Sequence, residues 1–95
     1  MPTLQIEHGV RDFDAWKQVF DGDPVGRAAG GVRRYRVMRP LDDPAYVVVD
    51  LEFDTTAEAE AFREKLRELW SGAGASLGLE SPRARIVEVV EANAY

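Results

Sequence analysis

Residues 45–53 constrain the fold more than any other part of the chain, because their side chains alternate in character. One alternating set is wholly apolar and the other is mixed: Val47, Val49, Leu51 and Phe53, against Tyr46, Val48, Asp50 and Glu52. A period of two places the two sets on opposite faces of a β-strand. The apolar set predicts a face that packs under another layer, and the mixed set predicts a face that no layer of the same chain covers.

The first strand candidate shows the same alternation. Residues 3–9 end at a glycine, and their side chains form an inner and an outer set: Leu4, Ile6 and His8, against Gln5 and Glu7. The one histidine of the chain is therefore in phase with two apolar residues.

Two more strands are expected at residues 32–39 and 83–91. The connection 40–44 is short and rich in Pro and Asp, so the strands on either side of it should pair as an antiparallel hairpin. The segment 71–82 is rich in Gly, Ala and Ser, which predicts a loop.

Two helices are expected between these strands. The first begins after Asp12, a favourable N-cap residue, and Phe13, Trp16 and Phe20 recur on one helical face. A proline ends this helix after about ten residues, and residues 25–29 are expected to resume as a short helix.

The second helix opens with a capping box, in which Thr55 is followed three residues later by Glu58. It is expected to run through Trp70. Its apolar side chains share one face: Ala59, Phe62, Leu66, Leu69 and Trp70.

The order of elements is therefore β-α-β-β-α-β in one domain, residues 1–95. Right-handed crossovers place both helices on one face of the antiparallel sheet, which is a ferredoxin-like α+β sandwich. The side chains expected on the open face combine apolar residues with complementary charges: Gln5, Glu7, Arg34, Arg36, Met38, Tyr46, Val48, Asp50, Glu52, Arg83, Arg85, Val87 and Val89.

Two interpretations of this open face are possible. A chain of 95 residues has a small core of its own, so pairing two open faces would give a homodimer a second, shared core. Alternatively, the face is solvated, and Asp50, Glu52 and Glu7 pair with Arg34, Arg36 and Arg85 at its surface.

Composition excludes several classes of function. The net charge is −5, with 17 acidic and 12 basic side chains, which argues against nucleic acid and anionic membranes as partners. There is no cysteine and only one histidine, so neither a Cys-based nor a His-rich metal site is expected. The N-terminus does not have the pattern of a signal peptide, and the cytoplasm is the expected location.

Several stretches resemble the dimeric α+β barrel superfamily: residues 10–20, residues 30–36, and residues 47–54 leading into residues 57–62. This superfamily includes antibiotic-biosynthesis monooxygenase-type proteins and small polyketide cyclases. The resemblance implies that two sheets close face to face into a barrel. It also implies a pocket between sheet and helices for a small aromatic or polyketide-like ligand. Because members use different residues, it assigns no catalytic role by position.

His8 is the candidate catalytic residue, as a general base or as an anchor for a ligand, since an imidazole titrates near neutral pH. The alternative is a partly exposed histidine that caps a turn at the end of the strand. The candidate pocket residues are aromatic: Trp16, Phe20, Tyr35, Phe62 and Trp70. The alternative for these aromatic side chains is ordinary packing in the core or in the sheet.

Two functions therefore remain open at the level of sequence. One is a cofactor-independent monooxygenase, isomerase or cyclase that acts on a small aromatic or polyketide-like molecule. The other is a non-catalytic dimer that binds a small ligand or assists another protein. Neither a metal nor a cofactor is expected in either case.

Overall fold

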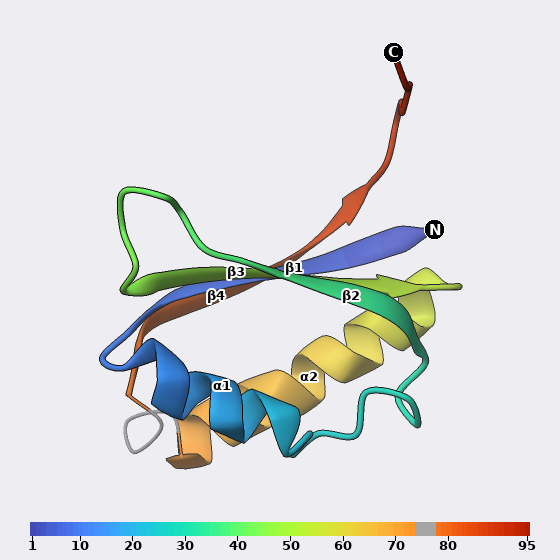
Figure 1. Ribbon diagram of the computed structural model, residues 1–95. Helices are drawn as coiled ribbons and strands as arrows, with labels where there is room; N and C mark the ends of the chain where they lie inside the picture. The colour runs from blue at the N-terminus through green and yellow to red at the C-terminus, as the bar shows by residue number, and fades with distance from the viewer. Residues whose placement is uncertain (74–77) are drawn as a thin grey trace.

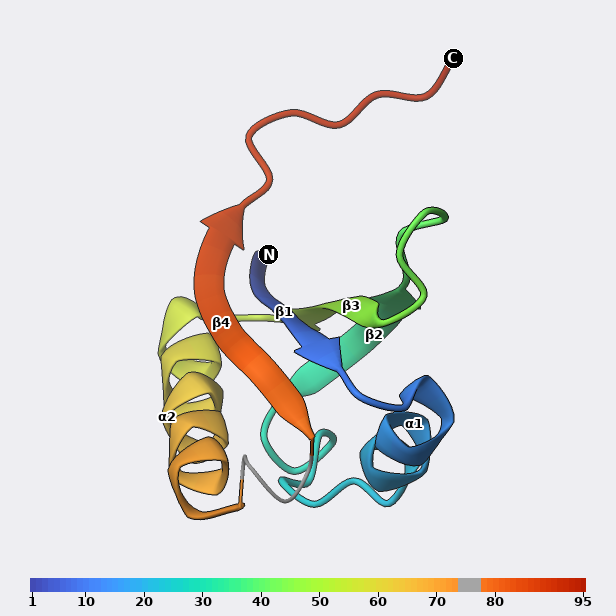
Figure 2. The same ribbon diagram turned by 90° about the vertical axis from the view of Figure 1, so that its left-hand side faces the viewer.

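The computed structural model of the protein describes residues 1–73 and 78–95, and it confirms the predicted order of elements (Figure 1). The six elements are β1 (Pro2–Val10), α1 (Phe13–Asp21), β2 (Val32–Met38), β3 (Tyr46–Phe53), α2 (Thr56–Ala73) and β4 (Leu79–Glu88). The four strands pair antiparallel in the order β2-β3-β1-β4. Both helices lie on one side of the sheet (Figures 1 and 2). The fold is therefore the predicted ferredoxin-like α+β sandwich.

The core lies between the sheet and the helices, on the face that the alternation predicts. The two central strands and the two helices contribute its buried apolar side chains: Leu4, Ile6, Val10, Val47, Val49, Leu51, Phe53, Trp16, Ala59 and Phe62. Phe53 and Leu4 are completely buried. The two helices pack against this face because each has its apolar side chains on one stripe.

The open face carries the predicted charges in cross-strand pairs. Arg36 Nη2 lies 2.9 Å from Asp50 Oδ2, and Arg34 pairs with Glu52. On the same face, between β1 and the edge strand β4, Arg83 rather than Arg85 reaches Glu7, at 3.6 Å. Arg85 instead binds Gln5, since its Nη2 donates to the Oε1 atom of Gln5 over 3.2 Å.

Strand β4 begins earlier than its sequence predicts. It starts at Leu79 and ends at Glu88, and α2 continues to Ala73. The expected loop at 71–82 is therefore wrong at both ends. Its residues 74–77 lie outside the described part of the chain. A β-bulge explains the early start of β4, because the pairing of β4 with β1 shifts register between Glu7 and Gly9. Ser81 adopts a φ of 49° there, and a bulge accommodates the proline that follows it.

The expected short helix at 25–29 does not form. Residues 27–31 make hydrogen-bonded turns, and Gly26 has a φ of 81°, which a helix cannot accommodate.

Both predicted helix starts are confirmed. Asp12 Oδ1 accepts the backbone N–H groups of Asp14 and Ala15, at 3.0 and 3.2 Å. Among the described residues, neither helix is long and apolar enough to cross a bilayer.

The capping box at the start of α2 provides a test of the local stability of the fold. Thr55 Oγ1 accepts the N–H of Glu58 over 3.2 Å, and its hydroxyl contacts the Glu58 carboxylate. Thr55→Ala should therefore lower the free energy of unfolding by about 1 kcal/mol. The neighbouring Thr56→Ala is the control and should change it by less than about 0.5 kcal/mol. Equal effects in urea denaturation would contradict the capping role.

Candidate functional site

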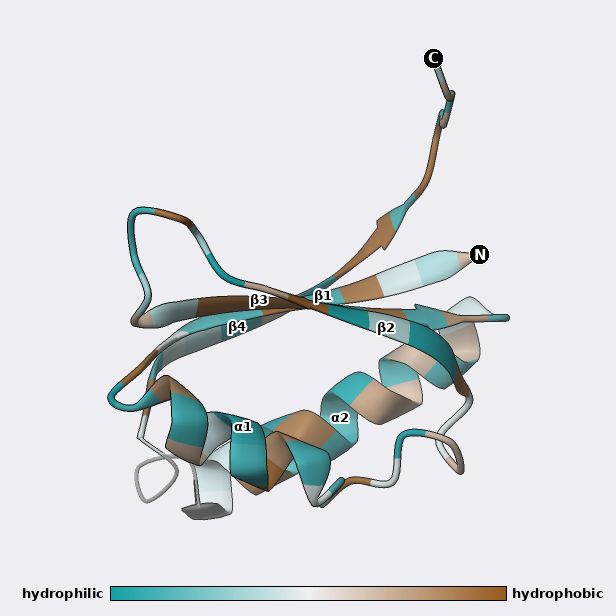
Figure 3. Cartoon of the chain, viewed as in Figure 1, coloured by the Kyte–Doolittle hydropathy of each residue, from teal (hydrophilic) through white to brown (hydrophobic). Residues whose placement is uncertain are grey.

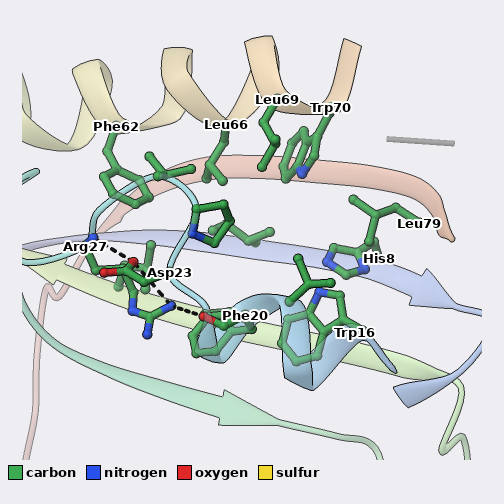
Figure 4. A pocket seen from close by; sticks show the side chains of 16 residues that line it. His8, Trp16, Phe20, Asp23, Arg27, Phe62, Leu66, Leu69, Trp70 and Leu79 are labelled. Atoms are coloured by element: carbon green, nitrogen blue, oxygen red, sulfur yellow. Dashed lines mark hydrogen bonds and ion pairs between the residues drawn. The ribbon is translucent and has the colours of Figure 1, made fainter. Parts of the chain in front are cut away.

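A partly open cavity of about 80 Å³ lies between the sheet and the two helices (Figure 4). Five elements and the 22–31 connection contribute to it. Most of the lining side chains are apolar: Ile6, Trp16, Val19, Phe20, Pro24, Val25, Val49, Leu51, Phe62, Leu66, Leu69, Trp70 and Leu79. Three titratable side chains complete the lining, namely His8, Asp23 and Arg27. The lining therefore has the composition of a small-molecule site, with apolar walls and a few polar groups at its ends.

His8 is buried, with 3% of its surface exposed, so the alternative of a partly exposed histidine at the strand end is wrong. It reaches the cavity because the alternation of β1 places it on the same face as Ile6. Its ring meets the ring of Trp16 edge to face, with 5.7 Å between the centroids. Figure 4 shows the two side chains together at one end of the cavity.

Burial lowers the pKa of His8 below its ordinary value of 6.5, and the hydrogen bond with the Gly9 carbonyl opposes this effect in part. The ring is therefore neutral at neutral pH. Nδ1 lies 3.1 Å from the carbonyl oxygen of Gly9, which can only accept a hydrogen bond. Nδ1 must then carry the proton, and Nε2 is left with a lone pair that can accept one.

Four of the five predicted aromatic residues line the cavity: Trp16, Phe20, Phe62 and Trp70. Trp16 and Phe62 are also buried core residues, and the other two pack against the core. The rings of Trp16 and Phe20 lie 5.2 Å apart and form one continuous wall. The same four side chains therefore both pack in the core and line the cavity. Their role in ligand binding stays a prediction.

Tyr35 lies outside this lining. Its ring meets the ring of Phe20 edge to face, 5.3 Å away, and 46% of the residue is exposed. It belongs to β2, the outermost strand on its side of the sheet. Tyr35 therefore supports the cavity wall from behind Phe20.

Sequence reasoning missed Asp23 and Arg27, which lie in the connection between α1 and β2. Arg27 Nη1 donates to the carbonyl of Phe20 over 2.7 Å and lies 3.6 Å from Asp23 Oδ1. The only signal in the sequence is the spacing of four residues between opposite charges. Because this segment has no helical or strand periodicity, the spacing does not predict where the two side chains point.

Arg33 and Arg34 pair with different carboxylates and do not form a common site. Arg33 Nε donates to Asp54 Oδ2 over 2.7 Å, and this hydrogen bond and the charge of Asp54 raise the pKa of Arg33. Arg34 points to the open face and pairs with Glu52. Within residues 1–73 and 78–95, no group of three His, Asp or Glu side chains is arranged to hold a metal ion.

Comparison with solved structures shows the same fold. SnoaB, a cofactor-independent oxygenase from Streptomyces nogalater, matches with a TM-score of 0.72 and 17% identity, over 96% of this chain and 94% of that one. A dimeric ferredoxin-like protein from an uncultured marine organism matches with a TM-score of 0.66 and 15% identity, over 97% of each chain.

A further solved structure, described as an antibiotic biosynthesis monooxygenase, matches with a TM-score of 0.62 and 13% identity, over 96% of this chain and all of that one. No protein-family model and no curated protein matches the sequence. At these identities the similarity shows the fold, which agrees with the resemblance that the sequence suggested.

The buried state of His8 predicts a pH-dependent loss of stability. Above its unfolded pKa of 6.5, the imidazole is neutral in both states and contributes no difference. As the pH falls below 6.5, the unfolded chain gains a proton that the folded chain resists, so stability falls until the lower folded pKa is reached. Between about pH 7.5 and about pH 5, the wild type should lose more unfolding free energy than His8→Gln. Parallel losses in the two proteins would contradict this account.

Proposed function

We propose that the protein is a homodimer that binds a small, largely apolar aromatic molecule in the cavity between sheet and helices. We further propose that it acts on this molecule as a cofactor-independent enzyme of the oxygenase, isomerase or cyclase type. The observation that carries this proposal is the neutral, buried His8 in the wall of a cavity whose other side chains are mostly apolar.

The chemistry assigned to His8 is removal of a proton from the ligand. With its Nδ1 proton directed to the Gly9 carbonyl, the ring keeps its orientation and offers Nε2 as the base. A proton on a carbon next to a carbonyl, or on a phenol, is the natural partner of such a base. Its removal is a first step shared by isomerisation, by ring closure and by the reaction of a carbanion with O₂. The solved oxygenase of the same fold supports this choice of reaction class.

A ligand-binding dimer without catalysis is the second candidate. It is favoured by the scarcity of acid–base groups in the cavity, where the described lining contains only Asp23 and Arg27 besides His8. Those two side chains already contact each other. Such a protein would be stabilised by the ligand and would leave it unchanged.

The dimer is proposed to form through the open face of the sheet. Two segments rise from the sheet on the side away from the helices: the β2–β3 connection and the C-terminal residues after β4 (Figures 1 and 2). Both carry exposed apolar side chains, since Leu41 is fully exposed in the first and Val90 is 93% exposed in the second. Figure 3 shows the apolar stretch where the chain leaves β4. These side chains would flank a partner placed on the open face, and solved proteins of this fold that are described as dimeric support the arrangement.

A charge introduced into the open face should separate the protomers. At micromolar concentration, light scattering of the wild type should give twice the chain mass of 10.6 kDa. Val87→Asp places an unpaired carboxylate opposite Thr3 on the proposed interface and should raise the dissociation constant by about tenfold or more. The control Ala61→Asp adds the same charge to the exposed side of α2 and should leave the dimer intact. A monomeric wild type, or a Val87→Asp variant whose dissociation constant equals that of the wild type, would contradict the proposed interface.

Hydrogen–deuterium exchange tests the role of His8 without knowledge of the natural substrate. The probe is 2-indanone, a small aromatic ketone with acidic C–H groups, and NMR follows their exchange in D₂O. The wild type should accelerate exchange, and His8→Gln should reduce the acceleration about a hundredfold or more. Binding of 2-indanone, measured by tryptophan fluorescence, should change little in the variant. Binding without acceleration by the wild type would instead support the non-catalytic candidate.

A further inference from the structure

The cavity contains a mostly buried cation at the end remote from His8. The side chain of Arg27 is only 17% exposed, and Figure 4 shows Arg27 and Asp23 at one end of the cavity, with His8 and Trp16 at the other. An apolar wall separates the two ends. Burying a charge costs free energy unless hydrogen-bond acceptors surround it. The partners of this guanidinium therefore indicate its role.

Two aromatic rings hold the guanidinium group in place. Its central carbon lies 4.0 Å from the ring centroid of Phe20 and 4.8 Å from that of Tyr35. These contacts fix the position of the cation without using any of its N–H donors. The site is therefore already ordered before a ligand arrives, which reduces the entropy cost of binding.

The hydrogen bonds of Arg27 leave most of its donors available. A guanidinium has five N–H groups. In the described part of the chain, its short side-chain hydrogen bond is the one from Nη1 to the Phe20 carbonyl. The carboxylate of Asp23 is 3.6 Å from the same nitrogen and accepts the backbone N–H of Arg27 over 2.8 Å. Asp23 thus offsets part of the charge but does not form the two-point pair that a guanidinium prefers with a carboxylate.

We propose that Arg27 is the anion-binding residue of the cavity, and that the ligand is an aromatic molecule carrying a carboxylate or a similar planar oxyanion. This inference rests on the proposed ligand-binding role of the cavity. The oxyanion binds the free donors of Arg27, the aromatic body lies along the wall formed by Phe20 and Trp16, and the opposite end of the ligand reaches His8. The anion therefore sets the direction in which the ligand enters and which of its atoms meets the base.

Asp23 has a defined part in this arrangement. In the absence of ligand its carboxylate is the nearest counter-charge of Arg27, and it repels an incoming anion. Removing that charge should strengthen binding of the anion. Asp23 has a φ of 54°, a conformation that asparagine tolerates well, and an amide oxygen can still accept the N–H of Arg27. Asp23→Asn is therefore compatible with the observed backbone.

The test compares benzoate with benzamide, which have nearly the same shape but differ in charge. Both tryptophans of the chain line the cavity, so intrinsic fluorescence reports on its occupation. The wild type should bind benzoate about tenfold or more tightly than benzamide. Arg27→Met keeps the apolar stem of the side chain and should make the two affinities equal. Arg33→Met is the matched control, because it removes an exposed arginine outside the cavity, and it should keep the preference.

Asp23→Asn provides a second variant that does not depend on the stability of Arg27→Met, and it should tighten benzoate binding several-fold while benzamide binding stays constant. Equal binding of the two probes by the wild type would overturn the role of Arg27 and leave the cavity as a ligand site. Binding of neither probe would count against both this inference and the proposed function.

Discussion

The pairing of β1 with β3 is the interaction on which the rest of the structure depends. In the observed register, Ile6 lies opposite Val49 and Leu4 opposite Leu51, and all four side chains are buried on the helix-covered face. A slip of one residue would turn one strand over and move its polar side chains into the core. The same register places His8 opposite the buried Val47. The histidine faces the cavity because the core residues beside it must face the helices.

The alternation of side chains along the strands also makes the two faces of this sheet different. One face is covered by α1 and α2 and contains the cavity, and the other carries ion pairs between neighbouring strands. The arginines of these pairs are exposed, and ion pairs at an exposed surface contribute little to stability, about 0–1 kcal/mol each. Their value in the proposed dimer is selectivity, since opposite charges on one face define which orientations of a second copy are compatible. The cavity and the proposed interface are thus separated by the thickness of one sheet.

The sequence was sufficient for the elements whose periodicity is strong. Alternation in β1 and β3 predicted which side chains are buried, and the spacing in both helices predicted which helix faces line the cavity. It was insufficient where a single backbone irregularity decides the outcome, as at Ser81, whose bulge lets β4 continue past a proline. Arg27 escaped prediction because it lies in a connection without periodicity. Tyr35 has the phase of a pocket residue, but only the strand order shows that β2 is an edge strand, beyond the reach of the cavity.

The central claim is that His8, placed by the β1–β3 register, and Arg27, held between Phe20 and Tyr35, lie at opposite ends of one ligand cavity. A crystal structure of the protein with bound benzoate tests it most directly. We expect the aromatic ring to lie between sheet and helices, with its carboxylate on Arg27 and the ring edge directed to His8. Benzoate bound on the open face of the sheet, or in the cavity with its carboxylate turned away from Arg27, would contradict the account.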